Sequence, residues 1–265
     1  MARPTKITVA TVTWNAGTVL ERTLLSVEEQ DYADVQHVIV DGASSDDTLT
    51  MVRLYQERNT HPDREITLLS EPDHGLYDAM NKAIQLAEGD YIIFLNAGDK
   101  FHEASTLSKV VAFADNAPAV LYGDTDIVDN NGRFLRKRHL RPPRELSWRS
   151  FKRGMLVCHQ AFFARVDIAK KTPYDTNYRF SADYDWCIRI MKEARDAGLL
   201  LRNTQIVVAD YLDGGMTTKN HRRSLIERLK IMAKHYGWLT AVGMHISFLW
   251  RAAVNKVRRL NDYDR

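Results

Sequence analysis

Short apolar runs alternate with segments of helical periodicity along the first hundred residues. The runs are rich in β-branched residues, which favour buried parallel strands, and they are Ile7–Thr13, Val35–Val40, Ile66–Ser70 and Tyr91–Leu95. Between them, apolar residues recur three and four positions apart, which predicts helices over residues 19–27, 48–57 and 76–86. Strands that alternate with helices form βαβ units, so the pattern predicts an α/β fold with a mostly parallel central sheet flanked by helices.

The second half of the chain is less periodic. Strands are expected over Val120–Val128, with a hairpin turn at residues 130–132, and over Cys158–Arg165 and Thr204–Tyr211. Helices are expected over Asp183–Glu193, over Ser224–Tyr236 and over about Leu239–Leu260. No repeat or linker interrupts the chain, so we expect one continuous domain over residues 1–218, followed by a helical C-terminal appendage over residues 219–265.

Composition limits the class of protein. The 265 residues are 45% hydrophobic and 27% charged, which is typical of a globular domain. Two cysteines make no disulfide framework, which indicates a reducing compartment. No segment resembles a signal peptide, and the apolar stretch Leu239–Trp250 is shorter than the roughly 18–20 residues that a membrane span needs. We therefore expect a cytoplasmic protein.

Charge is distributed very unevenly around the small net value of +3. Residues 1–132 hold 9 Lys/Arg and 22 Asp/Glu, whereas residues 133–265 hold 28 and 12. A basic half with aromatic residues is compatible with nucleic-acid binding. However, no nucleic-acid motif is present and the acidic half would repel a phosphate backbone, so we expect no nucleic-acid partner.

The ends of the predicted strands carry the candidate chemistry. Parallel sheets bind ligands beyond the carboxyl ends of their strands, and these ends carry Thr13–Asn15, Asp41–Gly42, Glu71–Asp73 and Asn96–Asp99. Asp, Asn and Gly also form loops well, which is the alternative explanation. The motifs GxGxxG, GxxxxGK[ST], HExxH, CxxC and GxSxG are absent. An acidic rim followed by a basic half suits a nucleotide-sugar site, where carboxylates bind ribose and a divalent ion while cations receive the diphosphate.

Several segments resemble family 2 glycosyltransferases of the GT-A fold. Residues 40–48 (VDGASSDDT) are similar to the family's DGGSxDGT segment, and residues 70–83 (SEPDHGLYDAMNKA) resemble the SEPDxGIYDAMNKG run of exopolysaccharide enzymes of the colanic-acid type. Residues 94–99 (FLNAGD) stand where the family has its metal-binding DxD variant, and residues 158–163 and 181–186 resemble acceptor-side motifs. The resemblance runs from about residue 6 to residue 218. It implies a Rossmann-like GT-A domain whose residues 1–100 bind the nucleotide-sugar and whose residues 101–218 bind the acceptor.

The resemblance also implies a set of donor-binding residues. Asn15 and Asp41 would contact base and ribose with Trp14 nearby, and the remaining donor residues would be Asp73, Asp78, Asn81, Lys82 and Asn96. Asp78, Asn81 and Lys82 lie at i, i+3 and i+4, so one helical face could present all three. The alternative for Asp78 and Lys82 is a plain surface ion pair.

Asp99 is the candidate metal ligand, for Mn²⁺ or Mg²⁺. The family commonly has DADD here, but Asn96 and Gly98 replace two acids and leave Asp99 alone. One carboxylate can suffice because these ions take further ligands from substrate phosphates. The alternative is that Asp99 caps a helix near Ala104.

Asp183 is the candidate general base, which would take the proton of the acceptor hydroxyl. Partial burial is expected to raise its pKa toward the working pH. Asp185 is the rival base or an acceptor contact, although the two side chains point roughly 200° apart on a helix. The family resemblance makes His159 and Gln160 acceptor contacts as well. The alternative for Asp183 is helix N-capping together with Ser181.

Taken together, the resemblance implies an inverting glycosyltransferase of bacterial surface-polysaccharide assembly. Its donor would be a UDP- or GDP-sugar, and its acceptor a glycan or a polyprenyl-diphosphate-linked sugar. Residues 213–218 resemble a flexible lid, and the basic helix near Leu239–Leu260 fits an anionic inner membrane surface. That helix could equally pack on the catalytic domain or form a dimer. A nucleotide-sugar-binding protein without catalysis is the alternative function.

Overall fold

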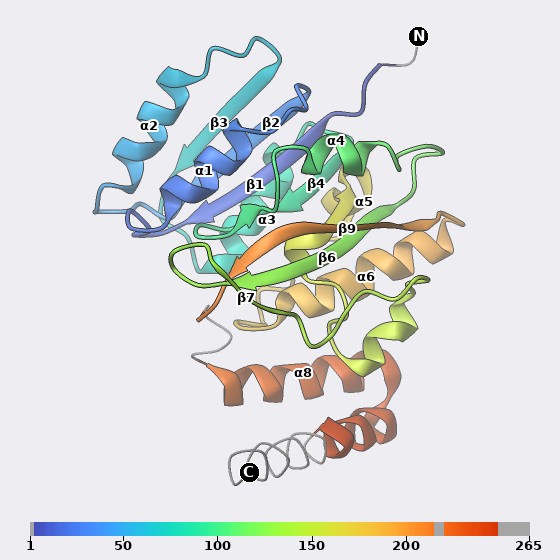
Figure 1. Ribbon diagram of the computed structural model, residues 1–265. Helices are drawn as coiled ribbons and strands as arrows, with labels where there is room; N and C mark the ends of the chain where they lie inside the picture. Colours follow the sequence, from blue (N-terminus) through green and yellow to red (C-terminus); the bar gives the residue numbers. More distant parts are fainter. Residues whose placement is uncertain (1–2, 215–219, 249–265) are drawn as a thin grey trace, which may run out of the picture.

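The computed structural model describes residues 3–214 and 220–248. A nine-stranded sheet forms its centre, in the order β3-β2-β1-β4-β8-β6-β9-β5, with β7 paired to β6 (Figure 1). The strands are β1 Ile7–Thr13, β2 Val35–Asp41, β3 Arg64–Ser70, β4 Tyr91–Phe94, β5 Lys100–Phe101, β6 Val120–Val128, β7 Phe134–Lys137, β8 Phe162–Arg165 and β9 Leu201–Leu212.

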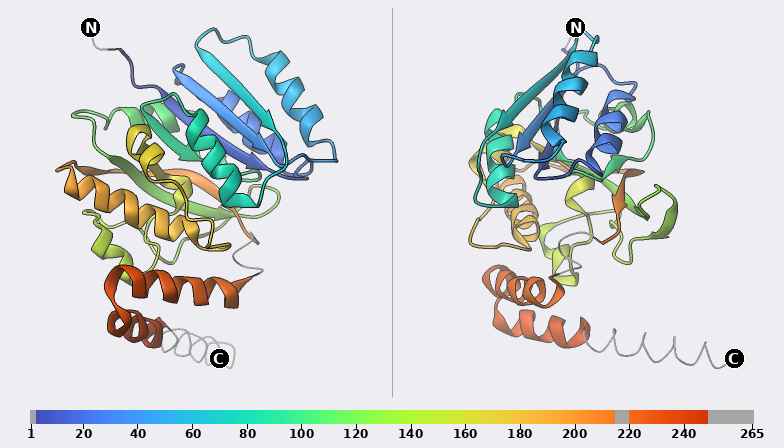
Figure 2. Two further views of the ribbon diagram at one scale, coloured as in Figure 1. Left: turned by 180° about the vertical axis from the view of Figure 1, so that it is seen from behind. Right: turned by 90° about the vertical axis from the view of Figure 1, so that its left-hand side faces the viewer.

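The first four strands form the expected parallel βαβ half. β1 pairs in parallel with β2 and β4, and β2 pairs in parallel with β3. Helices α1 (Leu20–Glu28) and α2 (Thr48–Arg58) pack on one face of the sheet, and α3 (Leu76–Leu86) packs on the other (Figure 2). Both faces are therefore covered, which explains why every residue of β1 and β2 is buried.

The second half turns the sheet into a mixed one. β8 runs antiparallel to both β4 and β6, whereas β9 runs parallel to β6. The strand expected over Cys158–Arg165 covers only Phe162–Arg165, because His159–Ala161 forms the short 3₁₀ helix η2. The backbone N–H of Ala161 bonds to the carbonyl of Cys158 in this turn instead of continuing a ladder. As a result the polar side chains of η2 lie beside the end of β4.

Helices cover the second half on the α3 side. They are α5 (Val166–Lys171) and α6 (Ala182–Asp196). The second half also contains two short elements, α4 (Thr106–Val111) and the 3₁₀ helix η1 (Trp148–Arg153). α6 contributes the fully buried Trp186, whose ring contacts Phe94, Phe162 and Tyr174. These aromatic contacts fix the start of α6 against the end of β4.

Two C-terminal helices lie beneath α6 and η1 (Figures 1 and 2). The first is α8 (His221–Tyr236), and the second covers residues 238–248 in the described structure. The second helix packs Ala241, Met244 and Phe248 on the main core, so this part follows the expectation that it packs on the catalytic domain. None of the described helices is long and apolar enough to cross a membrane. Residues 215–218 of the lid expected over residues 213–218, and the rest of the expected last helix, lie outside the described residues.

Candidate active site

The carboxyl ends of β1, β2 and β3 meet at one rim, as the strand pattern predicts. Asp41, the last residue of β2, has no exposed surface. One carboxylate oxygen accepts from the hydroxyl of Ser44, and the other accepts from the Ser44 amide at 2.9 Å and the Ser70 hydroxyl at 2.8 Å. Asp41 thus ties the end of β3 to the loop after β2. It orders the rim from within, whereas the sequence led us to expect an open ligand contact.

Trp14 and Asn15 form the exposed part of the same rim. Asn15 has a left-handed φ of 47°, and its side-chain oxygen accepts from the Ser45 amide at 2.9 Å. This bond ties the turn after β1 to the loop after β2. Trp14 keeps 69% of its surface exposed, although it is large and apolar. The rim therefore presents a free aromatic face, which suits stacking on a planar base.

Gly42 lets a third loop approach this tryptophan. A Cβ atom on Gly42 would lie 2.5 Å from the Asp73 carboxylate and 3.4 Å from the Trp14 ring. Trp14 and Asp73 therefore meet over Gly42, and a larger residue there would have to displace the Asp73 carboxylate. Asp73 also accepts from the Gly75 amide at 2.7 Å, which orders the start of α3.

The three polar residues of α3 do not act as one face. Asn81 both donates to the carbonyl of Tyr174 and accepts from its amide, so it ties α3 to the loop after α5 and not to the rim. Lys82 lies 2.8 Å from the Glu71 carboxylate but 3.8 Å from Asp78. Asn81 is thus occupied by the backbone of Tyr174, where we expected a donor surface shared with Asp78 and Lys82, and those two residues order the loop before α3.

The turn after β4 holds Asp99 in a buried position. Asp99 is 5% exposed, and its carboxylate accepts from the Gln160 amide nitrogen at 2.9 Å and the Leu212 amide at 3.1 Å. Burial raises the pKa of Asp99 to about 6, although both hydrogen bonds oppose the rise. Asp99 makes no cap with α4, so the structure does not support that alternative.

Asn96 supplies a second oxygen in this turn. Its backbone carbonyl accepts from the Asp99 amide at 2.9 Å, and its side-chain oxygen is buried with no hydrogen-bond partner. A buried unpaired oxygen beside a carboxylate of raised pKa fits a cation. Among the described residues no cluster of three or more His, Cys, Asp or Glu side chains could hold a metal alone. Two side-chain oxygens alone do not complete the coordination of such an ion, which would need further ligands from a bound molecule.

His159 connects this turn to the start of α6. Its Nδ1 lies 3.3 Å from the Asp183 carboxylate, and its Nε2 lies 3.2 Å from the side-chain nitrogen of Asn96. Asp183 also accepts from the hydroxyl of Tyr77 at 3.2 Å. The end of β4, η2, α3 and α6 thus converge on one polar group, although Asn96 and Asp183 are far apart in sequence. Tyr77 was missed because a buried tyrosine in a helical pattern predicts core packing.

The pKa of Asp183 is lowered, contrary to expectation. Burial acts to raise it, but the neighbouring His159 and the charge of Arg228 together outweigh burial. Asp183 is the second residue of α6 and accepts from the next backbone amide, while Ser181 makes no side-chain cap. The carboxylate is therefore ionised at neutral pH, and helix capping does not explain its position.

Gln160 and Asp185 are both used inside the fold. Gln160 is 1% exposed, donates to Asp99 and accepts from the Cys158 thiol, so it positions Asp99 and faces no acceptor. Asp185 is fully buried, and its carboxylate lies 2.6 Å from Arg189 Nε and 2.7 Å from His235 Nε2. Both side chains thus have partners inside the fold of the described structure, where the sequence led us to expect acceptor contacts.

Comparisons with known proteins give a family match and a related sequence. The model of the family described as glycosyl transferase family 2 matches residues 8–172. A PGL/p-HBAD biosynthesis glycosyltransferase of Mycobacterium bovis is 32% identical over 230 residues, which cover 84% of this chain and 83% of that protein.

Two solved structures share the fold. S. aureus TarS 1-349 in complex with UDP superposes with a TM-score of 0.66 at 18% identity, covering 92% of this chain and 70% of that one. The mannosyltransferase PcManGT from Pyrobaculum calidifontis, in complex with GDP-Man and Mn²⁺, gives a TM-score of 0.60 at 18% identity, covering 98% and 81%. At such identities the likeness concerns the fold.

Proposed function

Because the chain belongs to glycosyl transferase family 2, we propose that it transfers a sugar from a nucleotide-sugar to an acceptor hydroxyl with inversion of the anomeric centre. That it is a glycosyltransferase follows from the family; the donor, the acceptor and the stereochemistry are the proposal. The observation that carries it is the His159 contact, which joins the Asp183 carboxylate to the Asn96 side chain. A candidate base and a candidate diphosphate site thereby belong to one cluster of contacting side chains.

Asp183 is the general base of the proposed reaction. As the acceptor oxygen attacks the anomeric carbon, its proton passes to the Asp183 carboxylate. The bond between that carbon and the diphosphate oxygen breaks, and its electron pair leaves with the nucleoside diphosphate. The lowered pKa of Asp183 keeps it ionised and ready to accept the proton, while His159 and Tyr77 hold its orientation. Attack on the face opposite the leaving group inverts the centre.

The donor lies along the rim of the parallel strands in this proposal. Trp14 stacks on the base, Asn15 and Asp73 line the pocket, and Asp41 orders the loops from beneath. Two structural neighbours hold UDP and GDP-Man, which supports a nucleotide-sugar of either base.

A divalent ion completes the donor site. Asp99 and the side-chain oxygen of Asn96 would hold Mn²⁺ or Mg²⁺, and the bound ion would neutralise charge on the diphosphate. Gln160 and the Leu212 amide keep the Asp99 carboxylate in place. The Mn²⁺ in the mannosyltransferase neighbour supports this choice.

The acceptor is a glycan or a polyprenyl-diphosphate-linked sugar of surface-polysaccharide assembly, as the SEPDHGLYDAMNKA run supports. The helix over residues 238–248 exposes Trp238, Leu239, Val242 and Ile246 on one side, with Leu239 93% exposed. An apolar helix face beside a basic chain segment suits an anionic membrane surface.

The test is turnover of UDP- and GDP-sugars with Mn²⁺, measured as released nucleoside diphosphate in the wild type and in Asp183→Asn. We expect release from one donor class only, lost in Asp183→Asn although the variant still binds the donor. Donor binding without release in either protein would show a binding protein instead. The configuration of the product, read by NMR, tests inversion.

A further inference from the structure

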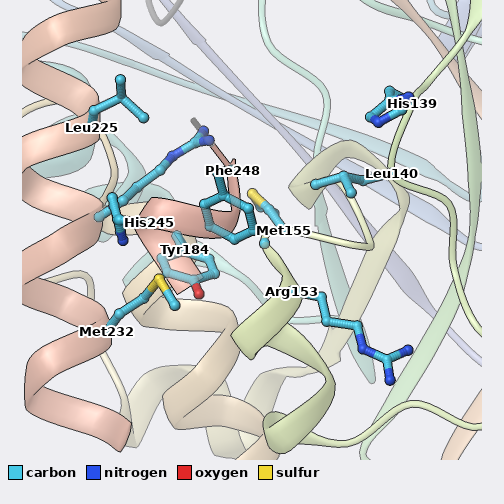
Figure 3. Close-up of a pocket in the computed structure, with 11 residues that line it drawn as sticks. His139, Leu140, Arg153, Met155, Tyr184, Leu225, Met232, His245 and Phe248 are labelled. Carbon is cyan, nitrogen blue, oxygen red and sulfur yellow. The ribbon is translucent and has the colours of Figure 1, made fainter. Parts of the chain in front are cut away.

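A largely apolar cavity of about 280 Å³ lies between the main domain and the C-terminal helices. It is closed by the segment before and after η1, the first turn of α6, α8, and the helix over residues 238–248 (Figure 3). Figure 3 shows Tyr184, Met155 and Phe248 close together, with Met232 and Leu225 on α8 beside them. Such a cavity has the size of a small ligand site.

Two arginines are among the residues that line this apolar space. Arg153, Arg228, His139 and His245 line it, and none of its lining residues is an Asp or Glu. Within residues 3–214 and 220–248, neither arginine side chain makes an ion pair or hydrogen bond. Arg228 Nε and His245 Nε2 are buried and have no partner. A buried guanidinium nitrogen without a partner at the edge of an apolar cavity favours an anion there.

The cavity adjoins the proposed base. Tyr184 lines it and directly follows Asp183, and the charge of Arg228 reaches Asp183 strongly enough to help lower its pKa. The geometry is held by the buried hydroxyls of Ser181 and Ser224, which lie 2.9 Å apart and join α6 to α8. The cavity and the proposed base are thereby held at the same turn of α6.

The helix that closes the cavity has two apolar sides. Its inner side brings His245 and Phe248 to the cavity, and its outer side exposes Leu239 and Ile246, at 93% and 62%. An acceptor whose apolar chain is longer than the cavity would find a second apolar surface on the same helix. A free glycan would use neither surface.

We propose that this cavity binds the carrier of the acceptor: a lipid phosphate whose first apolar carbons fill the cavity, whose phosphate pairs with Arg228 and Arg153, and whose sugar reaches Asp183. This inference rests on the proposed function and deepens it, because it chooses the lipid-linked acceptor over the free glycan. Two arginines favour phosphate, since each guanidinium can bind it in a bidentate manner. Apolar lining and unpaired cations together match an amphiphile better than either a neutral lipid or a free anion.

The test uses farnesyl diphosphate, farnesol and inorganic pyrophosphate as probes, with calorimetric titration of the full chain. Saturating nucleoside diphosphate and Mn²⁺ are present to block the donor site. We expect farnesyl diphosphate to bind at least about tenfold more tightly than the other two probes, since it alone satisfies both features of the cavity. Arg228→Gln should weaken it about tenfold, and Leu225→Trp, which fills the cavity, should weaken it as well.

Arg53→Gln is the matched control. Arg53 is exposed on α2, makes no ion pair among the described residues, and should leave binding unchanged. The inference is overturned if pyrophosphate binds as tightly as farnesyl diphosphate. It is also overturned if Leu225→Trp and Arg228→Gln bind farnesyl diphosphate as tightly as the wild type does. Donor turnover that depends on Asp183, measured in the same proteins, separates the carrier site from the proposed glycosyl transfer. If it persists while the lipid phosphate fails to bind, only the carrier site is wrong.

Discussion

Two carboxylates that stand two residues apart on α6 should separate catalysis from stability. Asp183 lies beside His159 and Tyr77, whereas Asp185 is buried against α8. We compare Asp183→Asn with Asp185→Asn, which make the same chemical change on the same helix. The first should abolish turnover and the second should weaken the fold.

The magnitudes follow from the contacts. Asp185 has no exposed surface and pairs with Arg189, His235 and, at 3.3 Å, Lys234. Removing one partner from a buried ion cluster leaves uncompensated charge and costs about 3 kcal/mol, which lowers Tm by about 6–12 °C in a domain of this size. Loss of a general base lowers kcat by about 10²–10⁴.

The assays are urea unfolding and release of nucleoside diphosphate at saturating donor. Asp183→Asn should keep donor affinity and lose less stability than Asp185→Asn, because its side chain keeps 15% exposure and an amide oxygen can still accept from Tyr77. Asp185→Asn should keep kcat at temperatures where it remains folded. The reasoning is refuted if Asp185→Asn is as stable as the wild type but inactive, or if Asp183→Asn turns over normally.

Three further predictions concern the rim and the sheet. The folded pKa of Asp99, about 6, lies above its ordinary value of 3.8, so ionisation of this carboxyl destabilises the fold. The wild type should therefore lose about 2 kcal/mol of stability relative to Asp99→Asn as the pH rises from 4 to 7. Mn²⁺-dependent turnover should fall below pH 6 as this carboxylate is protonated, and a flat profile would contradict the metal role. Burial lowers the pKa of His37 from 6.5 to about 3. The wild type should therefore lose stability as the pH falls below 6.5, by up to about 1.4 kcal/mol per pH unit relative to His37→Gln, measured by urea unfolding. If the free energy of unfolding changed equally with pH in both proteins, His37 would not be buried. Gly42→Ala would place a Cβ atom 2.5 Å from the Asp73 carboxylate. It should weaken donor binding about tenfold, as measured by calorimetry. An unchanged donor affinity would contradict this prediction.

The parallel half of the fold is predictable because its pattern is local. β1 and α3 have the bounds that apolar spacing predicts, since each strand and helix carries its own periodicity. β5 was not predicted because two residues carry no period. The start of β8 was misplaced because His159 and Gln160 take positions set by Asp183 and Asp99, which are remote in sequence.

The site was predictable only where a motif fixes a role by itself. Helical spacing places Asp183 and Asp185 on different sides of α6. It does not indicate which of these sides is covered by α8, whose His235 and Lys234 pair with Asp185. Likewise, the backbone groups that occupy Asn81 come from a loop 93 residues later. The direction of the Asp183 pKa depends on Arg228, a further remote residue.

The central claim is that the turn at Asn96–Asp99 and the base at Asp183 line one pocket around a nucleotide. Paramagnetic broadening of histidine ring signals by Mn²⁺ tests it directly, with UDP or GDP added. His159 bridges the two groups, while His61 precedes β3 at the opposite end of the parallel strands. The account predicts that Mn²⁺ and nucleotide together broaden the His159 signals and leave those of His61 sharp. Equal broadening of both, or an unaffected His159 in the presence of bound nucleotide, would contradict it.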